Sequence, residues 1–138
     1  MTAKEYFHRI DELNDMIPTK MRQIASLRDA LGIAVPPTDA EHVSHTRNVH
    51  AMEDVVTALV DAEREVNALL DELVDLKNRM VHVIGQLADH KEVTLLTERY
   101  IAGKAIVAIA TESGYSRRRV EQLIKRATEH VDVILERA

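Results

Sequence analysis

The amino-acid sequence predicts an all-α protein, in which a long N-terminal helical hairpin or coiled-coil arm precedes a three-helix domain with a helix-turn-helix. Two observations favour this fold class. Apolar residues recur at spacings of three and four through most of the chain, and no segment shows the alternation typical of strands. The composition agrees, since hydrophobic residues make up 46% of the 138 residues and aromatic residues only 3%. Such a stock of aliphatic side chains suits the packing of helix on helix.

The first helical segment is expected from about residue 2 to residue 31. Its apolar residues form one stripe along a helix, at Tyr6, Ile10, Leu13, Ile17, Ile24, Leu27 and Leu31. Pro18 lies inside this pattern, so we expect a kink or a break there. Residues from about 34 to 50 lack periodicity and include Pro36 and Pro37. We therefore expect them to form a linker.

The second segment carries the strongest periodic signal in the chain. Its apolar residues alternate spacings of three and four over five heptads, at Met52, Val55, Leu59, Ala62, Val66, Leu69, Leu73, Leu76, Met80, Val83 and Leu87. A helix this long must bury its stripe against the first segment, against another chain, or against both. We expect both, in a homodimer of helical hairpins. The dimer contacts are then assigned to Leu59, Val66, Leu69, Leu73, Leu76 and Met80.

Charge divides the chain into two expected domains. Residues 1–90 hold 9 Lys/Arg and 16 Asp/Glu, whereas residues 91–138 hold 9 Lys/Arg and 7 Asp/Glu. Such an asymmetry points to one end that binds nucleic acid and one that does not. We therefore expect a dimerisation arm over residues 1–90 and a DNA-binding domain over residues 91–138.

The DNA-binding domain is expected to contain three short helices. The first runs from about residue 91 to residue 101 and ends near Gly103, and the second runs from about residue 104 to residue 113 and ends at Gly114. The third starts with Ser116 as its N-cap and runs toward Glu136. A small residue in the second helix, Ala110, and a glycine in the turn fit a helix-turn-helix.

The third helix has the chemistry of a recognition helix. Ile109, Tyr115, Val120 and Leu123 are expected to face the core, which leaves a basic outward face. Because Arg reads guanine and Gln reads adenine, Arg117, Arg118 and Gln122 are the best candidates for contacts with base edges. Phosphate contacts are assigned to Lys104, Lys125 and Arg126. The candidate DNA-binding residues are therefore Lys104, Ser116, Arg117, Arg118, Arg119, Gln122, Lys125 and Arg126.

The C-terminal part resembles the DNA-binding region four of bacterial sigma factors. The residues that carry this resemblance are Leu95-Leu96, Arg99-Tyr100-Ile101, Gly103-Lys104, Ile109-Ala110, Gly114-Tyr115-Ser116 and Arg119-Val120. Over nearly its full length, including its first six residues and Asp75-Leu76-Lys77, the chain resembles small sigma-like phage and prophage proteins of the ArpU and RinA types. The resemblance implies a late-gene transcriptional regulator, an activator that can contact RNA polymerase in the cytoplasm of a bacterial host. No segment resembles sigma region two, which a true sigma factor would need.

Other kinds of site have little support in the sequence. The chain has no Cys, and the spacing of His42, His45 and His50 matches no strong zinc signature, so no metal or cofactor is expected. No nucleophile stands at a readable spacing from a base, so we expect a binding protein rather than an enzyme. The first residues have no apolar core of a signal peptide, and no apolar run approaches a membrane span. We therefore expect a cytoplasmic protein with no membrane partner.

Two alternatives to a transcriptional regulator stay open at this point. A small terminase-like subunit for DNA packaging would also combine a helix-turn-helix with long helices, and it would form a closed ring. A helical protein–protein interaction module would use the heptad face alone, so it would tolerate the loss of Arg117, Arg118 and Arg119.

Overall fold

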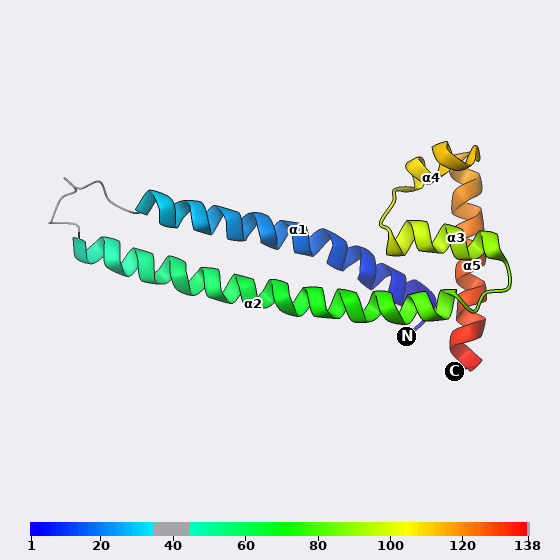
Figure 1. The fold of residues 1–138 in the computed structure, drawn as a ribbon, viewed down its shortest axis with the longest axis horizontal. Coiled ribbons are helices and arrows are strands. Elements are labelled where there is room, and N and C mark those ends of the chain that lie inside the picture. The colour runs from blue at the N-terminus through cyan, green and yellow to red at the C-terminus, as the bar shows by residue number, and fades with distance from the viewer. Residues whose placement is uncertain (35–44, 138) are drawn as a thin grey trace. The chain divides into compact units, whose positions relative to one another are not determined.

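The computed structural model describes residues 1–34 and 45–137, and within these ranges the chain is helical, with no strand. The elements are α1 (Ala3–Ala34), α2 (His45–Ile84), α3 (His90–Leu96), the π-helix η2 (Thr97–Ile101), α4 (Ile106–Ser113) and α5 (Arg117–Arg137) (Figure 1). The predicted all-α class, with long helices before a helix-turn-helix domain, is confirmed. The helices form two compact units, and each is considered by itself below.

Two predictions about the first half of the chain need correction. Of the kink or break expected at Pro18, the break is absent, because α1 is a single helix with Pro18 inside it. The missing N–H of proline costs about 3 kcal/mol in a helix interior. Burial of Leu13 and Ile17 on the apolar face offsets this cost. The linker expected over residues of about 34 to 50 is too long at its C-terminal end, since α1 ends at Ala34 as expected but α2 already begins at His45. Residues 35–44 lie outside the described part.

Unit 2 comprises residues 15–71, where α1 and α2 run antiparallel. Its core is small and comes from both helices, with Ile24, Ala62 and Val66 buried and Leu27 and Leu59 packed against them. Ion pairs flank this core, with Lys20 Nζ 2.7 Å from Glu65 Oε2 and Arg28 Nη2 2.8 Å from Glu63 Oε1. Ala62 and Val66 of the predicted heptad stripe are therefore buried against α1 of the same chain, with Leu59 packed beside them.

Unit 1 comprises residues 1–14 and 72–138, so it joins the start of α1 and the end of α2 to the C-terminal helices. Its core draws on each of these elements, with fully buried side chains at Phe7, Ile10, Met80, Ile84, Leu96, Ile109, Val120 and Val131. Residues from both sides of the predicted domain boundary at residue 90 thus share one core. This core holds α4 and α5, which carry the candidate site.

Candidate nucleic-acid interface

The turn between α4 and α5 has the features that the sequence predicts. α4 ends at Gly114, which has φ 76° and ψ 4° and whose N–H donates to the carbonyl of Ala110 at 3.0 Å. A residue with a side chain would be strained in this left-handed conformation. Ser116 then caps α5, because its Oγ accepts a hydrogen bond of 3.1 Å from the N–H of Arg119. Gly114 and Ser116 together fix where α5 begins.

The apolar face of the two helices packs largely as expected. Ile109 and Val120 are buried in the core of unit 1, and Leu123 is half-buried against it. Ala110 is also buried, which agrees with a small residue where the two helices approach each other. Tyr115 departs from the prediction, since 42% of it is exposed. It lies in the turn, beyond the apolar face of either helix, and so it is not part of the core.

The outward face of α5 carries the predicted basic residues. Arg118, Gln122 and Lys125 follow at positions i, i+4 and i+7, so they lie along one stripe, on the side of the helix opposite Val120 and Ala127. Their exposure contrasts with complete burial of Val120 and Ala127. This stripe, defined as Arg118, Gln122 and Lys125, is called the outward stripe below.

Three further cations surround the outward stripe. Arg119 and Arg126 lie seven residues apart and are exposed along one side of it. Arg117 is exposed on the other side, where its Nε lies 3.3 Å from Glu121 Oε1. An exposed ion pair of this kind stabilises by at most about 1 kcal/mol, so Arg117 can leave it for another anion. From Arg117 to Arg126, α5 therefore presents five cations and one carboxylate.

A groove of 540 Å³ runs beside α5. Arg119 and Arg126 line it from α5, and His90 and Lys91 line it from α3. Glu112 and other carboxylates line it as well, so its charge is mixed. The outward stripe, rather than this groove, is the better place for a polyanion.

Lys104 differs from the other candidate residues in its surroundings. It lies before α4, and its Nζ is 2.8 Å from Glu112 Oε2 and 3.8 Å from Glu98 Oε1. The hydrogen bond to Glu112 raises the pKa of Lys104 above its ordinary value. Lys104 stays charged, but two carboxylates of the same chain already compete for it. It is a weaker candidate for a phosphate contact than Lys125.

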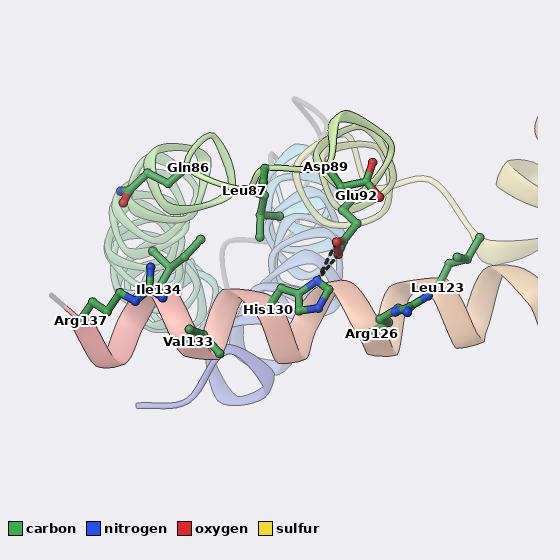
Figure 2. A pocket seen from close by; sticks show the side chains of 11 residues that line it. Gln86, Leu87, Asp89, Glu92, Leu123, Arg126, His130, Val133, Ile134 and Arg137 are labelled. Atoms are coloured by element: carbon green, nitrogen blue, oxygen red, sulfur yellow. Dashed lines mark hydrogen bonds and ion pairs between the residues drawn. The ribbon is translucent and has the colours of Figure 1, made fainter.

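Contacts between distant parts of the chain hold α5 in place, and sequence reasoning did not find them. His130 Nδ1 lies 2.6 Å and 2.7 Å from the two carboxylate oxygens of Glu92, a buried residue of α3 (Figure 2). Both residues line a cavity of 580 Å³ between α5, Glu92 of α3 and the segment of residues 86–89 that joins α2 to α3 (Figure 2). The two residues are 38 positions apart, so no local pattern could have paired them.

The start of α1 also supports the C-terminal helices. Phe7 stacks on Tyr100 with ring centroids 4.0 Å apart and an interplanar angle of 7°. Burial raises the pKa of Tyr100 above its ordinary value. Asp132 of α5 accepts a 2.7 Å hydrogen bond from the backbone N–H of Ala3, and so satisfies a free donor in the first turn of α1. The start of α1 therefore contacts α5 directly, through a hydrogen bond between residues 129 positions apart in the sequence.

The six residues assigned to dimer contacts lie on the side of α2 that faces α1. Val66 is buried with Ile24 in unit 2, and Met80 is fully buried in unit 1. The other four are half-buried, at Leu59, Leu69, Leu73 and Leu76. Val66 and Met80 are thus covered within a single chain, whereas the four half-buried leucines keep part of their surface exposed.

The remaining predicted features concern metals, membranes and relatives. Among the residues whose side chains the structure describes, 1–32 and 49–137, no group of His, Asp or Glu side chains is arranged to hold a metal ion, and His42 and His45 lie outside these ranges. None of the described helices is long and apolar enough to cross a membrane.

Comparison with protein-family models, curated proteins and solved structures found no match.

Proposed function

We propose that this protein binds double-stranded DNA through α5 in a sequence-specific manner and regulates transcription. The observation that carries the proposal is the outward stripe on a capped helix after a glycine turn. The first turns of such a helix fit the major groove, where Arg and Gln can make bidentate contacts with guanine and adenine. Arg118 and Gln122 are assigned to base edges, and Lys125 and Arg126 to phosphates.

The resemblance to sigma region four and to phage late-gene regulators supports a more specific role. On that basis we propose an activator of phage late genes that acts in a bacterial cell as a homodimer and contacts RNA polymerase. Two copies of α5 would suit a palindromic operator with paired half-sites. The protein acts by binding alone in this proposal, without a catalytic step.

A selection from a random duplex library, followed by titration of the enriched site, tests sequence-specific binding. The wild-type protein is expected to enrich one short motif. Arg118→Ala and Gln122→Ala should each weaken binding to that motif by about 1–3 kcal/mol and relax the base preference at one position. Lys125→Ala should instead weaken binding to every duplex alike and reduce the salt dependence by about one phosphate contact.

Arg137→Ala is the matched control for these variants. It removes the same charge from the same helix, but it lies 19 residues after Arg118, about 28 Å along the axis. Binding should therefore be retained. If the wild type enriches no motif, and Arg118→Ala and Arg137→Ala reduce affinity equally, binding is non-specific charge attraction and the proposal is wrong.

A further inference from the structure

α2 carries a second apolar stripe that α1 does not cover. Six of its aliphatic side chains are between 38% and 54% exposed, at Val49, Val56, Val60, Leu70, Val74 and Val81. A single exposed valine is ordinary on a protein surface, but a set confined to one face of one helix is not. We therefore expect another helix or another chain to cover this apolar face of α2.

The stripe has the spacing of a coiled-coil seam. Its residues form two series with a period of seven, and the second series lies four positions after the first. The first series comprises Val49, Val56, Glu63, Leu70 and Lys77, and the second comprises Glu53, Val60, Asn67, Val74 and Val81. Since this seam is offset from the one that contains Val66 and Met80, α2 has one seam for α1 and another that is unoccupied in the single chain.

We propose that a second copy of this chain covers the seam, with the two α2 helices antiparallel about a two-fold axis near residue 65. Residues at equal distances on either side of that axis then face each other. The layers are Val60 with the partner's Leu70, Val56 with the partner's Val74, Val49 with the partner's Val81, Glu53 with the partner's Lys77, and Glu63 with the partner's Asn67. Every apolar residue meets an apolar residue, and every polar residue meets a polar one.

Charge selects this orientation over a parallel one. In a parallel, in-register dimer each residue faces its own copy, so Glu53, Glu63 and Lys77 would each meet a like charge. Like charges placed directly opposite each other are destabilising. The antiparallel arrangement pairs Glu53 with an opposite charge instead, and it does so twice because of the two-fold axis.

The pattern also selects one antiparallel register. A shift by one heptad in one direction places Lys77 against Val60 and Glu63 against Val74, and a shift in the other direction places Glu53 against Leu70. Each shift buries a charge against an aliphatic side chain, which is costly. Only the register centred near residue 65 avoids these contacts.

The polar layers nearest the axis reinforce this choice. Asn67 in a seam lowers stability but specifies register and orientation when it meets a polar partner. Glu63 already has a cation beside it, since Arg28 Nη2 lies 2.8 Å from its Oε1. Its carboxylate therefore keeps a counter-ion when the seam is covered. The interface deepens the proposed function, since it rests on the homodimer proposed there, but it does not depend on DNA binding.

Cross-linking between single-cysteine variants tests the orientation directly, because the chain has no native Cys. Val60→Cys and Leu70→Cys are oxidised separately and as a mixture, after circular dichroism shows that both fold. In the proposed dimer, residue 60 lies about 15 Å along the axis from its own copy, which is beyond the reach of a disulfide. We expect covalent dimers in the mixture and few in either variant alone. Dimers in each variant alone would mean a parallel seam and would overturn the proposal, as would their absence everywhere.

Sedimentation equilibrium of charge variants tests the register. Glu53→Lys and Lys77→Glu should each raise the dimer dissociation constant about tenfold, since each replaces two attractive layers by two repulsive ones. The double variant restores both layers and should recover the wild-type value. Glu136→Lys, an exposed position at the end of α5, is the control and should leave the constant unchanged. A monomeric wild type, or a double variant weaker than either single one, would overturn the register.

Discussion

Arg9 holds both carboxylate oxygens of Glu72. Its Nε lies 2.6 Å from Oε2 and its Nη2 lies 2.8 Å from Oε1, while its Nη1 donates to Glu12 at 3.1 Å. This bidentate pair joins the start of α1 to α2 across 63 residues of sequence, inside the unit that carries α5. The hydrogen bonds from Arg9 hold the pKa of Glu72 below its ordinary value of 4.5. The pair therefore makes stability depend on pH.

Glu72→Gln should destabilise the protein more at neutral pH than in acid. A carboxylate with a lowered folded-state pKa stabilises the protein fully above its unfolded-state value, and this stabilisation is lost as the pH falls through the folded-state pKa. Since both side chains are about one-third exposed, we expect a loss of no more than about 1 kcal/mol at pH 7. Urea unfolding at pH 7 and pH 3 measures the loss, and the difference in free energy of unfolding from wild type should be smaller at pH 3.

The control for this variant is Glu136→Gln, which changes the net charge equally without removing a contact with Arg9. It should track the wild-type free energy of unfolding at both pH values. If the difference in free energy of unfolding between Glu72→Gln and wild type is the same at pH 3 as at pH 7, the destabilisation comes from packing rather than from the ionised pair.

Local signals explain which parts of the fold could be predicted. The turn at Gly114 and the cap at Ser116 depend on the conformation of a few neighbouring residues, so the sequence indicates them directly. The exposure of Arg118 and Gln122 follows from helical periodicity. By contrast, the stack of Phe7 on Tyr100 depends on how whole helices pack, and residues 93 positions apart share no local pattern. The heptad of α2 showed that a partner exists, but its period fits α1 and a second chain equally well.

Phe7→Ala should destabilise the unit that carries α5, although Phe7 lies far from it in sequence. Phe7 is only 2% exposed and stacks on Tyr100. Truncation of a buried Phe removes its transfer free energy and leaves a cavity, so we expect a loss of about 3–5 kcal/mol in urea unfolding. Met16→Ala on the same helix is the control. Because Met16 is 38% exposed, its truncation should lower the free energy of unfolding far less. Equal losses for the two variants would contradict a shared core for α1 and α5.

Gly114→Ala should lower the free energy of unfolding through backbone strain alone. A Cβ at this position would meet nothing within 4 Å, so no clash contributes, but the φ of 76° is unfavourable for a residue with a side chain. We expect a loss of about 1–2 kcal/mol, and a smaller loss for Gly114→Asn because Asn tolerates this region better. Gly32→Ala, inside α1, should be neutral or slightly stabilising. Thermal melts of the three variants compare these effects, and equal losses for Ala and Asn would contradict the explanation.

Ser116→Ala should weaken both the start of α5 and the DNA contacts that depend on it. Its hydroxyl accepts the N–H of Arg119, so its loss leaves a donor of the first turn unsatisfied and should cost about 1 kcal/mol. Ser26→Ala, exposed in the interior of α1, should instead be neutral or slightly stabilising, since Ala is the better helix former there. Urea unfolding gives the stability, and hydrogen exchange at Arg119 and Val120 should speed up only in Ser116→Ala. If α5 positions Arg118 for base contacts, this variant should also lose affinity for an enriched duplex, whereas Ser26→Ala should keep it. Faster exchange without any loss of affinity would mean that the first turn of α5 does not contact DNA.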